Sequence, residues 1–304
     1  MDKKGFKCLF KSPKMNFQPF ISVIIPTYNR PDFLVNLLND LAKQNYLNFE
    51  VIIVDQSEKS PLGLKNVINS AKIKIKYFKI QQKGASRARN IGLQYSKGDF
   101  IVFLDDDVSI PENNFLREHI QCYNDPKIGG VSGRVIEKLK KLTIGRVGKV
   151  FPVICLPGGQ ADGEKFVFVD TVKGMNMSFR RDLLERIGGF DERFGAPSIY
   201  EETDVSLKIR RLGYKIIFSP KAKIIHLSAP RGGQRQEFNE DEFRFVAFRD
   251  RVLLFRNNYP IWLFPFFLCG NFGLALRPIL KLKWRPVFFA FMGLIEGIKS
   301  YLTD

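Results

Sequence analysis

The stretch that decides the fold is Asp99-Phe-Ile-Val-Phe-Leu-Asp-Asp-Asp107. Its five apolar residues, Phe100–Leu104, form a run of strand length that stops abruptly at three carboxylates. Ligands of open parallel sheets bind beyond the carboxyl ends of the strands, so the three aspartates lie where a binding cleft is expected. Residues 99–107 therefore predict an α/β protein with a functional site at the end of this strand.

Three more short apolar runs precede this one, and each also stops at polar residues. They are Phe20–Ile25, Glu50–Val54 and Ile73–Ile80. Between the first two, leucines recur at helical spacing behind Pro31, a residue suited to a first helical turn. These leucines are Leu34, Leu37, Leu38 and Leu41. The alternation predicts a parallel sheet with crossover helices, and it draws attention to Thr27–Arg30 and Asp55–Ser57 at the strand ends.

The second half of the chain predicts further elements and a change of composition. Arg181–Ile187 and Glu201–Leu212 are expected to be helices ended by glycines, and two strands are expected at Lys215–Phe218 and Ala222–Leu227. After Ser228 a basic, glycine-containing loop leads into an aromatic-rich helical tail. We therefore expect an N-terminal lead at residues 1–19, a catalytic domain at 20–228 and a C-terminal extension at 229–304.

The overall charge and the cysteines narrow the class of protein. A formal net charge of +17 favours a polyanionic partner, which could be nucleic acid, anionic lipid or a phosphorylated substrate. The cysteines form no C-x-x-C pair, so reduced thiols in a cytosol are expected. They are Cys8, Cys122, Cys155 and Cys269. Lys11, Pro13 and Lys14 interrupt the apolar stretch that a signal peptide needs, so secretion is not expected.

The aspartate triplet itself predicts a metal site. Like charges packed this closely either raise a pKa or recruit a hard cation, and carboxylate oxygens suit Mg²⁺ or Mn²⁺. The alternative is a solvated acidic turn that caps the following segment. Because the chain is so basic and the aspartates follow a buried strand, we favour the metal site.

Seven segments resemble, in order and spacing, the motifs of family 2 glycosyltransferases with the GT-A fold. They are Ser22–Arg30, Val51–Ser57, Gly84–Gly92, Asp99–Asp107, Gly174–Arg181, Gly188–Glu192 and Glu201–Leu207. The resemblance covers roughly residues 20–227, and the ordered set is more specific than any one motif. It implies a Rossmann-like, mostly parallel mixed sheet flanked by helices, followed by a helical C-terminal extension. It also implies a non-processive enzyme of the bacterial surface-polysaccharide type.

The same resemblance implies residues that bind the nucleotide. Pro26, Thr27 and Asp55 would line the base pocket, with Asp55 accepting a hydrogen bond from the base. Arg89 and Asn90 fall in the matching nucleotide-side motif. For Thr27 or Asn90 alone, helix capping is the alternative role.

Metal and diphosphate ligands are implied in the same way. Asp105 would face the ribose and the metal, and Asp107 would bind Mn²⁺ or Mg²⁺ directly. His226 matches a position where many such enzymes place a histidine on the metal or the diphosphate, although a structural histidine is the alternative. Arg231 and Arg235 of the basic loop would stabilise the phosphate charge.

The catalytic base is implied to be Glu202, with Glu201 as the alternative. The family usually has Asp as the second residue of this pair, so the Glu201-Glu202 sequence leaves the role open between the two. A carboxylate in the first helical turn is stabilised as the anion and is ready to accept a proton, although ordinary charge decoration of a helix start is the alternative. On the acceptor and donor-sugar side the resemblance implies Gly174, Asn176 and Asp204.

The expected reaction is a metal-assisted single displacement with inversion at the anomeric carbon. One sugar would move from a UDP-, GDP- or dTDP-linked donor to a hydroxyl of a glycan or lipid-linked acceptor. A processive synthase is disfavoured because no Q-x-x-R-W pattern is present, and a nucleotidyltransferase because its Gly- and Arg-rich phosphate loop is missing. A nucleic-acid or membrane binding module without catalysis remains the alternative. The motifs of nucleic-acid binding domains are not evident, so no nucleic-acid partner is expected.

The C-terminal extension predicts contact with a membrane. No charged residue occurs from Tyr259 to Leu276, a stretch at the lower edge of membrane-spanning length that Pro and Gly interrupt. Basic residues flank it, which is typical of interfacial helices on an anionic membrane surface. A transmembrane or re-entrant segment at 259–276 and an ordinary packed helical subdomain are the alternatives. We therefore expect a cytoplasmic enzyme that is peripheral at the inner face of the cell membrane.

Overall fold

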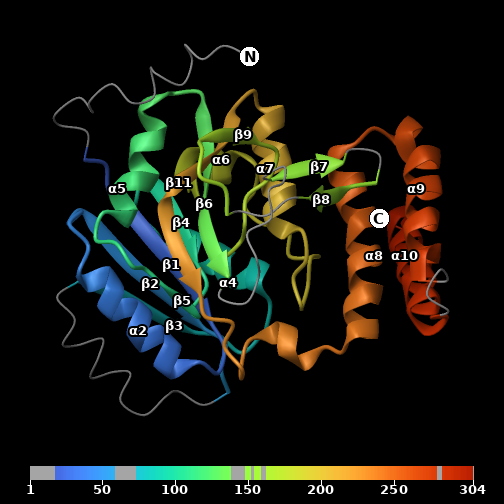
Figure 1. Ribbon diagram of the computed structural model, residues 1–304, viewed down its shortest axis with the longest axis horizontal. Coiled ribbons are helices and arrows are strands. Elements are labelled where there is room, and N and C mark those ends of the chain that lie inside the picture. The colour runs from blue at the N-terminus through green and yellow to red at the C-terminus, as the bar shows by residue number, and fades with distance from the viewer. Residues whose placement is uncertain are drawn as a thin grey trace.

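The computed structural model describes residues 18–58, 73–137, 148–151, 154–158, 162–278 and 283–303. A twisted sheet with helices on its faces occupies one side of the molecule, and three long helices stand beside it (Figure 1). These helices are α8 (Glu240–Asn258), α9 (Phe264–Leu276) and α10 (Arg285–Thr303). Residues 1–17 of the expected N-terminal lead lie outside the described residues.

One half of the sheet is parallel and has the strand order β3-β2-β1-β4. Its strands are β1 (Ile21–Thr27), β2 (Phe49–Asp55), β3 (Lys74–Lys79) and β4 (Phe100–Leu104). The four strands predicted from the apolar runs are confirmed, with ends that differ by no more than two residues. All residues of β2 and β4 are buried, as expected for parallel strands that are covered on both faces.

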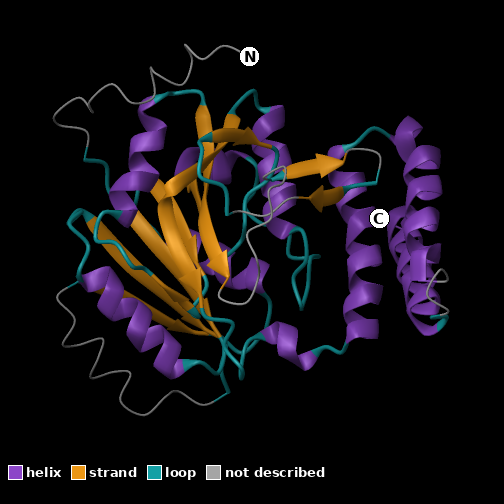
Figure 2. Ribbon diagram, viewed as in Figure 1, coloured by secondary structure: helices purple, strands orange, loops and turns teal. Residues whose placement is uncertain are grey.

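Helices cover both faces of this half. Helix α2 (Pro31–Ala42) lies in front of the sheet and α4 (Ala85–Tyr95) behind it (Figure 1), and Figure 2 shows the strands in orange between the purple helices. The four leucines that predicted α2 are buried, which confirms the face that it packs against the sheet. The α4 helix approaches β1 closely at Gly92, where a Cβ atom would collide with the side chain of Ile24.

The other half of the sheet mixes strand directions. Strand β10 (Asn176–Arg180) is antiparallel to both β4 and β6 (Ile128–Glu137), and β11 (Lys215–His226) is parallel to β6. Two short strands, β5 (Val108–Ser109) and β9 (Val167–Val169), pair with β11 in the antiparallel sense. The remaining elements are α5 (Phe115–Ile120), η1 (Gln121–Asn124), β7 (Lys149–Phe151), β8 (Leu156–Gly158), α6 (Arg181–Arg186), α7 (Glu201–Arg211) and η2 (Gln234–Glu237).

The expectation of two separate strands near residues 215–227 was wrong. Residues Lys215–His226 form the single strand β11, and its pairing with β6 shifts register between Ser219 and Lys223. Pro220 lies within this irregular part, and proline has no backbone N–H to give to a neighbouring strand. The interruption that the sequence shows is therefore a bulge inside one strand.

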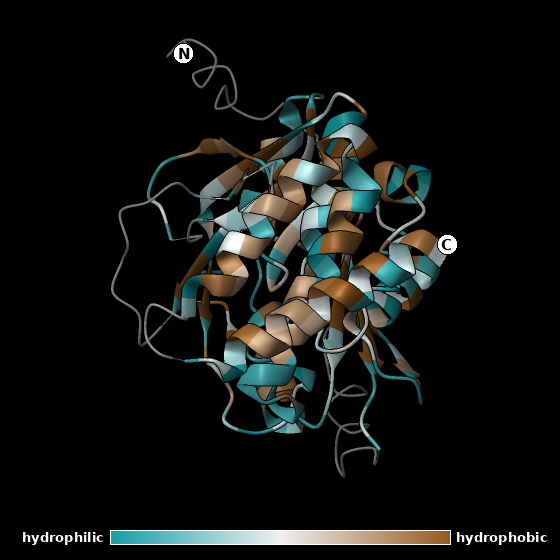
Figure 3. Ribbon diagram, turned by 90° about the vertical axis from the view of Figure 1, so that its right-hand side faces the viewer, coloured by the Kyte–Doolittle hydropathy of each residue, from teal (hydrophilic) through white to brown (hydrophobic). Residues whose placement is uncertain are grey.

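The C-terminal helices share an apolar core with the rest of the chain. Phe255, Phe267 and Leu294 of α8, α9 and α10 are buried in one cluster that also includes Phe194 and Leu207 from the sheet side. Figure 3 views these helices from their own side of the molecule. Helix α8 begins at a capping box, in which Asn239 and Glu242 satisfy each other's backbone N–H groups.

The described helices include none that is both long and apolar enough to cross a membrane. The uncharged stretch 259–276 consists of the short helix η3 (Ile261–Leu263) and the 13-residue helix α9.

Candidate active site

Two adjoining cavities open at the carboxyl ends of the parallel strands. The first has a volume of about 430 Å³ and the second about 330 Å³. Their walls share Arg89, Asp105, Met175, Glu201 and Arg235. The first cavity continues to Glu202, Lys173 and Gly174, and the second continues to the strand end at Pro26 and Thr27. Residues from most of the predicted motifs therefore meet at one place.

The three aspartates after β4 have different partners. Asp106 is buried and accepts a hydrogen bond from Thr27 Oγ1 at 2.7 Å and one from Arg30 Nη1 at 3.1 Å. Burial raises the pKa of Asp106 to about 7, although the charge of Arg30 opposes the shift. Asp107 lies 3.0 Å from the same Arg30 nitrogen and 3.5 Å from His226 Nε2. Arg30 therefore bridges two carboxylates.

The proton equilibria of Asp105, Asp107 and His226 depend on one another. Burial opposes ionisation of Asp107, but its hydrogen bond with His226 and the charge of Arg30 hold its pKa below the ordinary value. The same hydrogen bond raises the pKa of His226. Burial raises the pKa of Asp105, and the negative charge of Asp107 adds to the shift while Arg89 opposes it. A metal cation placed among these groups would be attracted by the two carboxylates, and it would displace the proton that the raised pKa of His226 favours.

The residues of this cluster fit a divalent cation in their chemistry. Asp105, Asp107 and His226 all line the second cavity, and two carboxylates with an imidazole suit Mn²⁺ or Mg²⁺. Among the described residues, however, no three His, Cys, Asp or Glu side chains converge as a complete metal site. Mg²⁺ in phosphate-transfer sites is commonly held by one or two carboxylates together with substrate phosphates. The described side chains therefore fit a cation that a bound diphosphate helps to hold.

The two histidines of the chain have opposite surroundings. His226 is half-buried at the cavity, where it contacts Asp107. His119 is fully buried, and its two ring nitrogens contact Ser178 and Asn176 at 2.9 and 3.0 Å. Burial lowers the pKa of His119 to about 4, so it is a neutral core residue.

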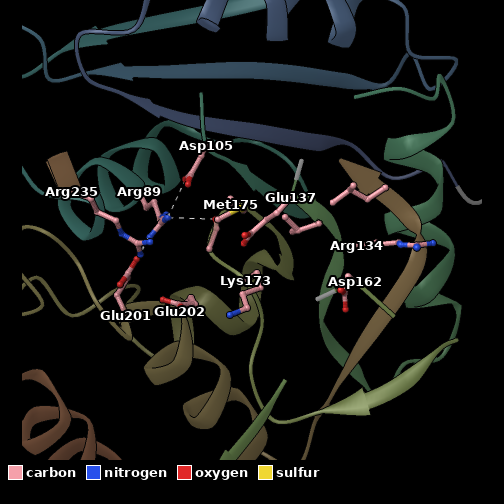
Figure 4. Close-up of a pocket in the computed structure, with 13 residues that line it drawn as sticks. Arg89, Asp105, Arg134, Glu137, Asp162, Lys173, Met175, Glu201, Glu202 and Arg235 are labelled. Atoms are coloured by element: carbon pink, nitrogen blue, oxygen red, sulfur yellow. Dashed lines mark hydrogen bonds and ion pairs between the residues drawn. The ribbon is translucent and has the colours of Figure 1, made fainter. Parts of the chain in front are cut away.

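The two glutamates at the start of α7 also have different surroundings. Glu201 is buried and forms an ion pair with Arg89, which in turn lies 3.6 Å from Asp105, so that Arg89 joins the two carboxylates (Figure 4). Glu202 is half-buried and lines the first cavity near Lys173 (Figure 4). Burial, together with the negative charge of Glu201, raises the pKa of Glu202 to about 7, although Arg89 and Lys173 oppose the shift. Of the two glutamates, Glu202 has the carboxylate that is free of an ion pair with Arg89.

The structure brings some of the predicted nucleotide-side residues to the cavities and not others. Pro26, Thr27 and Arg89 line the second cavity. Asp55 does not line it, because its oxygens accept hydrogen bonds from Tyr77 Oη at 2.6 Å and from the Ser57 backbone at 2.8 Å. The neighbouring Gln56 lines the cavity instead.

The side chain of Asn90 is engaged elsewhere. It donates to the Phe190 carbonyl oxygen and to Glu192, and its own oxygen accepts from the Phe190 backbone. Asn90 thus fixes the loop after α6 to α4. It lies inside α4 and Thr27 lies in β1, so neither residue is a helix cap.

Of the three residues expected on the acceptor and donor-sugar side, only Gly174 lines a cavity. A Cβ atom at Gly174 would lie 3.1 Å from Arg89 Nη2, so glycine leaves room for this arginine. Asn176 is fully buried and donates to the carbonyl oxygens of Arg134 and Ala222. Asp204 is also fully buried and belongs to the contact between helices α7 and α8. Both polar side chains therefore serve the packing of the fold.

The basic loop after β11 lies against the aspartates. Arg235 lines both cavities, and its charge acts on Asp105. Arg231 is exposed, and its carbonyl oxygen accepts a hydrogen bond from Arg30 Nε at 3.2 Å. A Cβ atom at Gly233 would collide with the Arg30 guanidinium, so this loop packs directly on Arg30.

Sequence reasoning missed the roles of Arg30 and Lys173. Arg30 ends the segment Thr27–Arg30, which the sequence singled out because it follows the first strand. The sequence did not predict the contact of Arg30 with the aspartates. Lys173 directly precedes the motif Gly174–Arg181, and only the folded chain places it near Glu202.

Comparison with known proteins gives a family and a fold. The model of the family described as glycosyl transferase family 2 matches residues 22–188. A probable glycosyltransferase of Bacillus subtilis, YdaM, is 28% identical over 216 residues, which are 67% of this chain and 50% of that protein. The O-antigen chain rhamnosyltransferase RfbN of Salmonella typhimurium is 24% identical and covers 93% of this chain and 96% of its own length.

Solved structures resemble the whole fold. TarS residues 1–349 of Staphylococcus aureus, in complex with UDP-GlcNAc, gives a TM-score of 0.64 at 20% identity and covers 93% of this chain and 81% of that chain. The mannosyltransferase PcManGT of Pyrobaculum calidifontis, in complex with GDP-Man and Mn²⁺, gives 0.58 at 20% identity and covers 98% and 92%. TarS is a poly(ribitol-phosphate) β-N-acetylglucosaminyltransferase and is 32% identical over 37% of this chain. The sequence matches span only half of YdaM and 22% of full-length TarS.

Proposed function

The chain belongs to glycosyltransferase family 2, and from this premise we propose that it moves one sugar from a nucleotide-diphosphate sugar to an acceptor hydroxyl, with inversion at the anomeric carbon. The observation that carries the proposal is the shared wall of the two cavities. Asp105 belongs to this wall, Asp106 and Asp107 line the second cavity, and Glu202 lines the first. Donor and acceptor would thus meet between a cation site and a base.

We assign the nucleotide-sugar donor to the second cavity. Pro26 and Thr27 would form the wall against the nucleoside, with Asp55 supporting that wall from behind through Ser57 and Tyr77. Arg235 would face the diphosphate from the loop after β11. Relatives of the same fold bind GDP-Man in one case and UDP-GlcNAc in another, which supports a nucleotide-sugar donor without choosing its base.

Asp105, Asp107 and His226 would hold a divalent metal ion, Mn²⁺ or Mg²⁺. When bound, the ion would neutralise charge on the departing nucleoside diphosphate. Two solved structures of the same fold contain Mn²⁺, which supports this choice. Arg30, which bridges Asp106 and Asp107, would keep the two carboxylates close together before the donor arrives.

Glu202 is proposed as the general base. Its carboxylate would take the proton of the acceptor hydroxyl while that oxygen forms the new bond to the anomeric carbon. At the same time the bond from the anomeric carbon to the phosphate oxygen breaks, and its electron pair leaves with the nucleoside diphosphate. A pKa of about 7 suits this role, because the group is largely ionised just above neutrality and still binds a proton well. Glu201, held by Arg89, would orient that arginine.

The acceptor is proposed to be a lipid-linked or cell-surface glycan. RfbN, which matches 93% of this chain, acts on the O-antigen chain. TarS, which matches 37% of this chain, acts on poly(ribitol-phosphate). Both relatives therefore modify surface polymers. Catalysis would be carried by residues 20–228 with the help of Arg235, and the rest of the extension 229–304 would hold the enzyme peripherally at the inner face of the membrane. A lipid-linked acceptor would be reached from that position.

The test is release of nucleoside diphosphate from a panel of UDP-, GDP- and dTDP-sugars with Mn²⁺, using water as the acceptor. We expect Glu202→Gln to lower the rate at least about 100-fold while donor affinity changes less than about twofold. Glu137→Gln, in the wall of the same cavity, is the matched control and should retain most of the activity. An active Glu202→Gln enzyme would refute the assignment of the base, and together with an inactive but folded Glu201→Gln enzyme it would move the base to Glu201.

A further inference from the structure

One face of helix α10 is buried against the rest of the protein. Ala290, Gly293 and Gly297 are buried against α8. A Cβ atom at Gly293 would collide with the Phe245 carbonyl oxygen, and one at Gly297 would lie 2.8 Å from the Val252 Cβ atom. The two helices are therefore as close as their backbones permit, and this side of α10 has no room for another partner.

The opposite side of α10 is also apolar, yet it is exposed. Trp284, Phe288, Met292, Ile295 and Leu302 recur at intervals of three, four or seven residues, which places them on one side of a helix. Their exposed fractions are 66%, 60%, 42%, 47% and 77%. A helix that is apolar on both sides is normally buried on both sides. The exposed side of α10 is therefore expected to be buried by a binding partner.

The neighbouring helix α9 also exposes apolar residues. It contains no charged residue, and Phe266, Phe272 and Leu276 are 60%, 41% and 44% exposed. Just before it, Ile261 and Trp262 of η3 are 58% and 67% exposed. Figure 3, which faces this side of the molecule, shows brown hydrophobic segments along these helices. We call the exposed apolar residues of η3, α9 and α10, together with Trp284 directly before α10, the outer face. Both tryptophans of the chain, Trp262 and Trp284, belong to it.

The charges around the outer face are mostly positive. In the described parts of α9, α10 and the turn between them, the cations are Arg277, Lys283, Arg285 and Lys299, and the single carboxylate is Glu296. Arg285 pairs with Asp241 of α8 at 2.6 Å, so it also ties the start of α10 to the protein. Apolar residues bordered by lysine and arginine, with tryptophans among them, match the chemistry of a bilayer interface.

We propose that the outer face lies in the headgroup region of an anionic lipid bilayer, with α9 and α10 parallel to the membrane plane. The inference deepens the proposed function, on which it rests for the idea of a membrane-borne acceptor, and it names the surface and its partner. A second copy of the chain is a weaker partner, because it would bring the same cations to the contact and offer no opposite charge. Anionic headgroups neutralise those cations and cover the apolar side chains at the same time.

The two tryptophans make the proposal directly measurable in the unmodified 304-residue chain. We expect vesicles containing phosphatidylglycerol to shift tryptophan emission to shorter wavelength, and lipids brominated along the acyl chain to quench it. Phosphatidylcholine vesicles should act much more weakly, and added salt should reduce the effect. Emission that does not respond to anionic vesicles, with the protein remaining in the supernatant after sedimentation, would overturn the proposal.

Two double variants distinguish vesicle binding through the outer face from nonspecific binding through other exposed apolar residues. Phe288→Gln with Ile295→Gln should weaken sedimentation with anionic vesicles by at least about tenfold, because two inserted side chains are lost. Phe151→Gln with Leu47→Gln removes two exposed apolar residues elsewhere, which are 47% and 85% exposed, and should bind vesicles like the wild type. Thermal unfolding confirms that each variant is folded.

Failure of this inference is distinguishable from failure of the proposed function. Vesicle binding is measured without a sugar donor, and donor hydrolysis is measured without vesicles, where both double variants should match the wild type. Light scattering measures the oligomeric state and so tests the competing partner, a second copy of the chain. A dimer that the Phe288→Gln and Ile295→Gln variant dissociates, in a protein that ignores vesicles, would assign the outer face to a second copy.

Discussion

At the scale of single residues, the site depends on giving neighbouring carboxylates unequal surroundings. Glu201 and Glu202 are adjacent in the first turn of α7, yet one pairs with a buried arginine and the other faces a cavity. Asp106 and Asp107 are likewise adjacent, and the pKa is raised at the first and lowered at the second. Such separation of pKa values between like groups is a common basis for dividing catalytic roles.

The raised pKa of Glu202 predicts how the rate depends on pH. A base must be ionised to accept a proton, so the rate should rise with pH up to about 7 and fall roughly tenfold per pH unit below it. Lys173 stabilises the ionised form, so Lys173→Met should move the midpoint of this profile to higher pH. Lys165→Met, an exposed lysine outside the cavity walls, is the control. An unchanged midpoint in Lys173→Met would separate Lys173 from the base.

Arg30 carries a prediction about stability. Arg30→Met leaves Asp106 and Asp107 close together without their shared cation, and we expect a loss of about 3 kcal/mol in the free energy of unfolding. Mn²⁺ should restore part of it. Arg87→Met breaks the exposed pair with Glu192 and should cost less than about 1 kcal/mol. Urea denaturation measures both values, and equal losses in the two variants would contradict a bridging role for Arg30.

At the scale of elements, the parallel strands and α2 could be predicted because their own residues specify them. Apolar runs such as Phe100–Leu104 end at polar residues, and the leucines of α2 all face one way. The direction of β10 and the continuity of β11 were not predictable, because they depend on pairing with strands far away in sequence. Asn90, Asn176 and Asp204 lie in the right motifs, yet only tertiary packing decides that their side chains contact other parts of the fold and not the cavities.

The capping box of α8 gives a prediction for an element. Asn239 accepts hydrogen bonds from the Asp241 and Glu242 backbones, so Asn239→Ala should lower the free energy of unfolding by about 1 kcal/mol. Asn114 occupies the same position before α5 without a capping hydrogen bond from its side chain, and Asn114→Ala should cost clearly less. If chemical denaturation shows no difference between the two variants, the cap does not stabilise α8 as described.

At the scale of the whole molecule, the C-terminal helices contact the helix that begins with the proposed base. Asn257 and Asn258 of α8 donate to Asp204, and Arg251 donates to the Tyr200 hydroxyl. Tyr200 and Asp204 flank Glu201 and Glu202 in the sequence. The change in composition after Ser228 predicted a boundary between two parts. The composition could not show that the start of α7 packs against the C-terminal extension.

The central claim concerns the whole site, which is that the aspartates after β4 bind a nucleotide sugar through a divalent cation. Calorimetric titration of the full chain with UDP-, GDP- and dTDP-sugars, with and without Mn²⁺ or Mg²⁺, tests it most directly. The account predicts that at least one donor binds only with the metal, that Asp107→Ala weakens binding by about 100-fold, and that the exposed control Asp182→Ala does not. Binding of no activated sugar under any of these conditions, or equal binding by Asp107→Ala and the wild type, would contradict it.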